Sequence, residues 1–156
     1  MPHPADTAAR HLPAGARLRS LTADDAPAVA SIAGQLGETD DPAYWRHKLE
    51  LFTRDAASCL GVELGGRLVA YMIGHVKGGE FGLADETAFL EFVGVDPAWQ
   101  GRGLARALAE ALVEQFALKG VRHVLTLVNT RDERLLPFFR SLGFRPSHLV
   151  CLERRL

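Results

Sequence analysis

The fold is decided by the stretch TAFLEFVGV (residues 87–95) and the segment DPAWQGRGLA (residues 96–105) that follows it. The first nine residues are mostly apolar, which is typical of a buried strand. After the turn, apolar side chains recur at helical spacing until Gly120: Leu104, Leu108, Leu112 and Phe116. We therefore expect a buried strand, a glycine-rich turn and a long helix in direct succession.

The glycine-rich turn predicts an anion site. Gly101 and Gly103 have no Cβ, so the backbone there can approach a ligand closely. The unpaired amides at the start of a helix, with the positive end of its dipole behind them, favour a phosphate group. A plain strand-to-helix connection, which needs glycine only to turn, is the alternative interpretation. A dinucleotide fingerprint is disfavoured because it needs a small residue where this chain has Arg106, and the G-K-[ST] of a P-loop is absent.

Before this stretch, the patterns predict a strand over residues 16–21 and amphipathic helices around residues 29–36 and 45–52. A hairpin follows, with strands 59–64 and 68–76 joined by two glycines. After the long helix we expect a strand over 121–128, a helix over 135–142 and a last strand over 149–156. This order predicts an α/β layered fold, with a mixed sheet covered by helices and a right-handed crossover.

Length and composition restrict the function class. The chain has 156 residues, which favours a single domain over residues 16–156 after a flexible leader, residues 1–15. The 18 Lys and Arg against 19 Asp and Glu give a net charge of -1, which argues against a nucleic-acid or anionic-membrane binder. No apolar run is long enough to span a bilayer or to act as a secretory signal.

Cys59 and Cys151 are far apart and have no ligand-like spacing, so we expect free thiols in a reducing compartment, the cytoplasm. The histidines have no metal-like spacing either, and no metal is expected.

Gln100-Gly101-Arg102-Gly103-Leu104-Ala105 resembles the Q/R-x-x-G-x-G/A motif of the GCN5-related N-acetyltransferase (GNAT) superfamily. The segment FFRSLGF (residues 138–144) resembles the second landmark of that superfamily, L/F-Y-x-x-x-G-F. The resemblance covers residues 16–156. It implies a mostly antiparallel sheet of six or seven strands with a central splayed parallel pair, flanked by about four helices.

The same resemblance implies acetyl-CoA as cofactor and a set of residues that hold it. The amides of residues 100–105 would bind the diphosphate of coenzyme A, and residues 93–95 would pair with its pantetheine arm like an added strand. Asp132 stands where the superfamily often has a cofactor-contacting Asn, for which Asn129 is the substitute. The full set is Val93, Gly94, Val95, Gln100, Gly101, Arg102, Gly103, Leu104, Ala105, Arg106, Asn129, Asp132 and Phe139.

Glu91 is the candidate general base, because it interrupts an apolar strand just before the cofactor segment. Similar enzymes often carry a glutamate two positions earlier, where this chain has Phe89. Strand alternation would keep positions 89 and 91 on one face unless Gly94 marks a bulge. A structural carboxylate paired with an Arg, or a water chain in place of a direct base, stays open as an alternative.

The general acid is less clear, because Phe139 replaces the tyrosine of the second landmark and a phenyl ring donates no proton. The thiolate then leaves unassisted, or is protonated through water or by Tyr71. Tyr71 and His75 share a face of their strand and are the candidate acceptor-binding residues. Three acidic residues of the preceding loop would attract a cationic acceptor or are simply solvated: Glu80, Asp85 and Glu86.

These inferences predict an acetyl-CoA-dependent N-acetyltransferase that acts on a primary amine of a small molecule or a protein. The alternatives are a different acyl donor or an oxygen acceptor, and a non-catalytic acyl-CoA-binding or sensing module. The last strand, rich in Leu and Val, is compatible with a homodimer contact.

Overall fold

The computed structural model describes residues 12–54 and 58–156. Five strands are formed over this part of the chain: β1 (Ala16–Ser20), β2 (Cys59–Leu64), β3 (Arg67–Lys77), β4 (Thr87–Val95) and β5 (His123–Thr126). The α-helices there are α2 (Ala26–Gln35), α3 (Pro42–Phe52), α4 (Leu104–Leu118) and α5 (Leu135–Ser141). Short 3-10 turns are η1 (Ala23–Asp25), η3 (Glu80–Gly82) and η4 (Pro97–Trp99).

The five strands form one sheet in the order β1-β2-β3-β4-β5. Neighbouring strands from β1 to β4 run antiparallel, and β4 and β5 run parallel. The parallel pair needs a crossover, which α4 provides, and the crossover begins at the glycine-rich turn that follows β4. The predicted mixed sheet with one parallel pair is confirmed, but the pair is not central: β5 is the edge strand of the described sheet.

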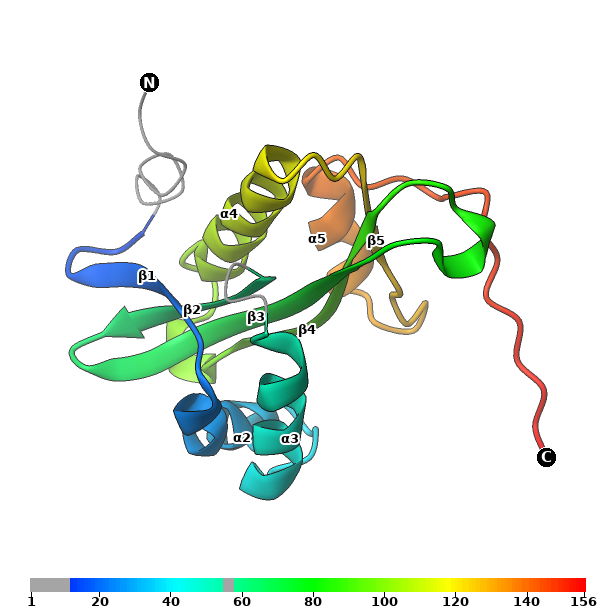
Figure 1. Ribbon diagram of the computed structural model, residues 1–156. Helices are drawn as coiled ribbons and strands as arrows, with labels where there is room; N and C mark the ends of the chain where they lie inside the picture. The colour runs from blue at the N-terminus through cyan, green and yellow to red at the C-terminus, as the bar shows by residue number, and fades with distance from the viewer. Residues whose placement is uncertain (1–11, 55–57) are drawn as a thin grey trace.

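Helices cover both faces of the sheet, with α4 and α5 on one side and α2 and α3 on the other (Figure 1). Each layer has its own apolar core, because alternate residues of the strands point to opposite faces. Met72, Leu90, Leu108 and Phe116 belong to the core under α4. Trp45, Leu49, Tyr71 and Ile73 belong to the core under α2 and α3.

A β-bulge interrupts β4 at Glu91. Ile73 lies opposite Phe92 and Gly74 lies opposite Leu90, so Glu91 has no residue of β3 opposite to it. Gly74 is required there, since a Cβ on it would lie 2.7 Å from the carbonyl oxygen of Phe89. The extra residue puts Phe89 and Phe92 on the same face of the sheet although they are three positions apart.

The edge of the sheet at β1 is held by an ion-pair cluster. Arg19 contacts Asp25 and Glu63, each at 2.7 Å, and thereby joins β1, η1 and β2. Burial raises the pKa of Asp25, but the hydrogen bonds that it accepts from Arg19 and from the Thr22 amide outweigh it and leave the pKa below its ordinary value.

The structure corrects two sequence predictions of the C-terminal part. The described residues form five strands and not six or seven, because the predicted last strand, residues 149–156, forms no ladder. β5 spans His123–Thr126 and not residues 121–128. The leader prediction falls mostly on residues 1–11, which lie outside the described residues, and Leu12 packs against the core.

Candidate functional site

The glycine-rich turn between β4 and α4 has the backbone geometry of an anion site. Gly101 and Gly103 have φ angles of 74° and 79°, in the left-handed region that favours glycine. The first helical hydrogen bond of α4 runs from the Ala107 amide to the Gly103 carbonyl at 3.0 Å. Among the described residues, nothing accepts a hydrogen bond from the amides of residues 101–106. These amides are therefore available to a ligand.

Side chains around the turn hold it in place. Asp96 accepts a hydrogen bond from the Ala98 amide at 2.9 Å, and the Gln100 side chain donates to the Val95 carbonyl at 3.2 Å. The Arg102 guanidinium lies over the Trp99 ring at 4.6 Å. Arg106 donates to the Ser141 hydroxyl at 2.6 Å, which connects the start of α4 to the end of α5. The Arg102 charge is thus exposed beside the free amides.

Next to the turn, the edge of β4 has an open stretch. β5 pairs with β4 only from Thr87↔His123 to Leu90↔Thr126, whereas β3 pairs with β4 as far as Val95. Residues 91–95 therefore have no strand partner on the β5 side within the described chain. Thr126 marks the end of the pairing, because its hydroxyl donates to the Leu90 carbonyl at 3.0 Å.

A cavity of about 40 Å³ lies where β4 and β5 part. Its lining comes from both strands, β3 and α5: Met72, Leu90, Glu91, Phe92, Val93, Thr126, Leu127, Leu135 and Phe139. Phe139 is 4% exposed and packs edge-on against Phe138 and Phe144. The landmark phenylalanine therefore forms the wall of this cavity.

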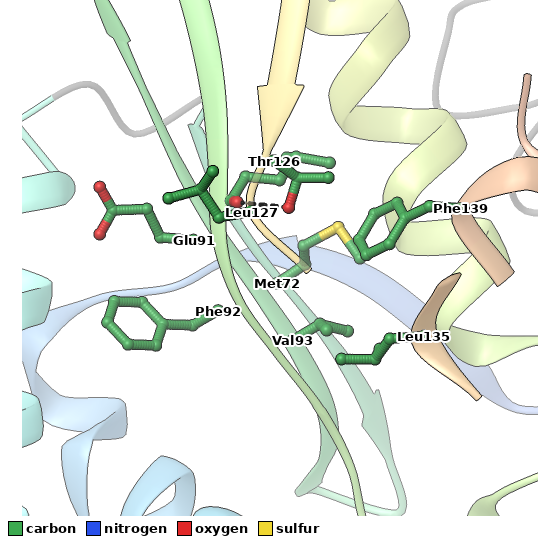
Figure 2. A pocket seen from close by; sticks show the side chains of 9 residues that line it. Met72, Glu91, Phe92, Val93, Thr126, Leu127, Leu135 and Phe139 are labelled. Carbon is green, nitrogen blue, oxygen red and sulfur yellow. Dashed lines mark hydrogen bonds between the residues drawn. The ribbon is translucent and has the colours of Figure 1, made fainter. Parts of the chain in front are cut away.

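Figure 2 shows that the lining residues divide between the two sides of β4. The side chains of Met72, Val93, Leu135 and Phe139 lie on one side, and those of Glu91 and Phe92 point to the other. The cavity is thus apolar towards α5, and the only acidic side chain in its lining points away from α5.

Asn129 and Asp132 lie in the loop between β5 and α5, and both side chains are used to shape that loop. Asn129 accepts a hydrogen bond from the Arg131 amide at 3.0 Å. Asp132 accepts from the amides of Arg134 and Leu135 at 2.9 and 3.1 Å. These backbone hydrogen bonds hold the pKa of Asp132 below its ordinary value. Asp132 therefore binds, as an anion, two amides at the start of α5, two residues before the N-cap residue Arg134.

Glu91 lies beside His75. The Glu91 side chain is 37% exposed, and its Oε1 is 3.3 Å from Nδ1 of His75, whose side chain is 11% exposed. No Arg or Lys of the described chain forms an ion pair with Glu91, so the predicted structural pairing with an Arg is absent there. A solvent-accessible carboxylate next to an imidazole is able to accept a proton from an arriving ammonium group.

Tyr71 and His75 lie on the same face of β3, towards α2 and α3, as predicted, but their surroundings differ. Tyr71 is fully buried in the core under α2 and α3, and burial, followed by the charge of Glu38, raises its pKa. A Cβ on Gly94 would lie 2.5 Å from the Tyr71 ring, which shows how closely the ring covers β4. In this structure Tyr71 is a core residue, which corrects its prediction as an acceptor-binding residue and as the general acid.

The remaining sequence candidates lie apart from this arrangement. Asp85 and Glu86 are exposed in the loop before β4, while the side chain of Glu80 is outside the described set.

The structure describes no cluster of three or more acidic, His or Cys side chains that would hold a metal ion. None of the helices in the described ranges is long and apolar enough to cross a membrane.

Sequence reasoning missed the bulge at Glu91 and the contact of that residue with His75. The signal that could have indicated the bulge is the pair of aromatic residues Phe89 and Phe92, since strict alternation would have placed them on opposite faces.

The sequence is similar to known acetyltransferases. A family model described as "Acetyltransferase (GNAT) family" matches residues 17–144. An N-alpha-acetyltransferase RimI of Mycobacterium tuberculosis is 34% identical over 87% of this chain and 80% of its own length. A mycothiol acetyltransferase of Clavibacter michiganensis is 31% identical over 94% of this chain, which spans 48% of that longer protein.

Solved structures agree in fold. An aminoglycoside N-acetyltransferase in complex with CoA superposes with a TM-score of 0.75 at 18% identity, covering 92% of this chain and 98% of that one. A ribosomal-protein-alanine N-acetyltransferase from Brucella melitensis gives 0.71 at 19% identity, over 90% of this chain and 99% of that one. With the family model spanning most of the sequence, the chain belongs to the GNAT family of acetyltransferases, enzymes that use acetyl-CoA.

Proposed function

We propose that this chain transfers the acetyl group of acetyl-CoA to a primary amine by direct attack. The observation that carries the proposal is one juxtaposition: the free amides of residues 101–106 adjoin the open edge of β4 at residues 91–95. A diphosphate fits the amides, and an amide-containing arm fits an open strand edge. The proposal extends to an acceptor amine of a small molecule or a protein.

The residues present fit the cofactor in chemical terms. The amides of residues 101–106, with Arg102 exposed beside them, would hold the diphosphate, and the backbone of residues 93–95 would pair with the pantetheine arm. Three further residues would support this site: Gln100 in the turn, Arg106 at the start of α4, and Phe139 in the cavity wall. Asn129 and Asp132 would contribute by shaping the neighbouring loop. When bound, acetyl-CoA supplies a thioester, at which a C–N bond replaces the C–S bond.

Glu91 is the proposed general base. An amine at neutral pH is mostly an ammonium ion, and it becomes nucleophilic only after it has lost a proton. The Glu91 carboxylate is exposed at the end of the cavity and is able to take that proton and to release it to solvent. Phe139 offers no proton to the departing thiolate, but a thiol with a pKa near 8.5 leaves readily as the anion.

Relatives suggest classes of acceptor to test. The names of similar proteins refer to an alanine of a ribosomal protein, to mycothiol and to aminoglycosides. Neither Cys59 nor Cys151 forms a disulfide within the described residues, which is compatible with the reducing cytoplasm as the site of action. A panel of an alanine-starting peptide, an amino sugar, a polyamine and an aminoglycoside therefore covers the proposal.

A binding experiment tests the cofactor site with a matched pair of variants. Gly101 and Gly120 have φ angles of 74° and 83°, and a Cβ on either one meets no other atom within 4 Å. Either change to Ala should therefore cost about 1–2 kcal/mol of stability. Calorimetric titration with coenzyme A should show a loss of about tenfold or more in affinity for Gly101→Ala only, because Gly120 lies at the far end of α4. Equal affinities in the two variants would contradict the assignment of the turn.

A turnover experiment tests the chemistry. Release of free thiol from acetyl-CoA in the presence of the amine panel should be measurable, and Glu91→Gln should lower kcat by about 100-fold or more. Coenzyme A binding without turnover on any amine would instead support a non-catalytic binding module. Full turnover in Glu91→Gln would leave acetyl transfer intact and remove Glu91 as the base.

A further inference from the structure

The contact between His75 and Glu91 joins two strands at the bulge. His75 Nδ1 on β3 lies 3.3 Å from Oε1 of Glu91 on β4. The distance is that of an ion pair, although the atoms are not aligned for a hydrogen bond. Such contacts are often loose in the free enzyme and tighten when substrate binds.

The imidazole of His75 stacks on two aromatic rings. Phe52 of α3 stacks on it at 5.0 Å and an interplanar angle of 11°, and Phe89 of β4 stacks on it at 5.2 Å and 15°. With its side chain only 11% exposed, His75 has little freedom to turn. The two stacking contacts therefore keep its Nδ1 beside Glu91.

Glu91 has no comparable support of its own. It is the unpaired residue of the bulge, and more than a third of its side chain is exposed. Of the cations of α3, Arg46 pairs with Asp24, and Lys48 has its Nζ over the rings of Tyr44 and Phe92 at 5.5 and 5.8 Å. The imidazole is thus the one group in the described chain that forms an ion-pair contact with this carboxylate.

We propose that His75 is a positioning residue that holds the Glu91 carboxylate ready to accept the proton of the acceptor ammonium. This inference rests on the proposed function and on Glu91 as its base. An N–H at Nδ1, 3.3 Å from Oε1, would donate to Oε1 once the contact tightens on substrate binding, which leaves Oε2 to take the proton from the amine. The proton then passes from Glu91 to solvent, and His75 itself need not touch the acceptor. The inference therefore replaces the prediction of His75 as an acceptor-binding residue.

Two substitutions separate positioning from packing. His75→Phe keeps an aromatic ring between Phe52 and Phe89 but has no N–H to offer. His75→Asn loses the ring but keeps a side-chain N–H near the place of Nδ1. If His75 acts through its N–H, kcat should fall about tenfold or more in His75→Phe and should be largely restored in His75→Asn. The KM for acetyl-CoA should be unchanged in both variants, because the cofactor turn is not touched.

A double variant gives a second readout. In the Glu91→Gln background, the added His75→Phe change should alter kcat by less than about twofold, because a residue that acts only through Glu91 has nothing left to position.

A measurement on the free enzyme does not depend on turnover. The imidazole of His75 can be followed by ¹⁵N NMR, and assigned among the six histidines by its absence in His75→Phe. Removing the negative charge in Glu91→Gln should lower its titration midpoint, because a carboxylate nearby favours the imidazolium. His47, exposed on α3, serves as the internal control and should not shift.

The outcomes distinguish this inference from the proposed function. Wild-type kcat in His75→Phe, equal losses in His75→Phe and His75→Asn, or an unchanged His75 midpoint in Glu91→Gln would each overturn the positioning role alone. Absence of turnover in the wild-type enzyme on every amine would overturn the proposed function, and the catalytic part of this inference with it.

Discussion

The two faces of β4 differ in chemistry although they belong to one strand. Towards α4 and α5, Leu90 and Val93 join Met72 and Phe139 in an apolar wall. Towards α2 and α3, the face is aromatic and carries a titratable pair, His75 and Glu91. The first face suits a cofactor arm that the fold must hold, and the second suits an acceptor whose proton must be removed. Glu91, the residue of the bulge, belongs to the titratable pair of the second face.

The largest effect should come from removing a large side chain from the apolar face. Phe139→Ala removes a ring that is 4% exposed and touches two other aromatic rings, so the free energy of unfolding should fall by about 3–5 kcal/mol. Urea unfolding measures this loss. Phe138→Ala is the control, since its half-buried ring should cost clearly less. Equal losses in the two variants would show that Phe139 is not a main support of this wall.

A smaller effect should come from adding one methyl group to the other face. A Cβ in Gly94→Ala would lie 2.5 Å from Cε1 of Tyr71, whose ring is fully buried and cannot move away freely. We expect a loss of about 1–3 kcal/mol. In Gly61→Ala the new Cβ instead meets the ends of two leucine side chains, Leu21 and Leu68, which can rotate. Thermal denaturation should therefore give a lower Tm for Gly94→Ala than for Gly61→Ala.

Tyr71→Phe should leave the stability of the protein unchanged or raise it, in contrast to the two changes above. The Tyr71 hydroxyl is buried and has no hydrogen-bond partner among the described residues, so its removal should be neutral or stabilise by about 1 kcal/mol. Because the folded pKa of Tyr71 is raised, the wild-type protein loses stability as the pH rises above about 10, where only the unfolded chain ionises. The advantage of the variant in Tm should thus grow between pH 9 and pH 11. Its turnover should equal that of the wild type, and a large loss would restore Tyr71 as a general acid.

The smallest effect should come from Phe139→Tyr, which restores the phenol of the superfamily landmark. A phenol can protonate a departing thiolate, but a thiol with a pKa near 8.5 needs little help at neutral pH. We expect kcat to change by less than about threefold, measured by thiol release between pH 6 and pH 9. A rise of tenfold or more would mean that thiolate departure limits the native enzyme.

The strand, glycine-rich turn and helix around residues 87–118 could be predicted from the sequence, because they depend on local signals. Glycines with positive φ, an apolar strand before them and a helix after them can be recognised one residue at a time. The surroundings of Glu91 depend instead on the register between strands. Alternation alone could not reveal that Glu91 is an extra residue, or that Tyr71 points into a core and His75 towards a carboxylate.

The predicted number of strands was wrong for a related physical reason. Residues 149–156 have the composition of a strand, but composition does not show whether the edge of β5 accepts them. In the structure their side chains are largely exposed, with Val150 at 77% and Leu152 at 89%.

The stacking of Arg102 on Trp99 gives the protein an intrinsic optical reporter. The chain has two tryptophans, and Trp45 is only 1% exposed in the core under α2 and α3, so its emission should stay constant. Trp99 stands at the rim of the glycine-rich turn under a guanidinium that an arriving anion would attract. Ligand occupancy of the turn should therefore be readable as a change in the red part of the emission spectrum, without a dye or a label.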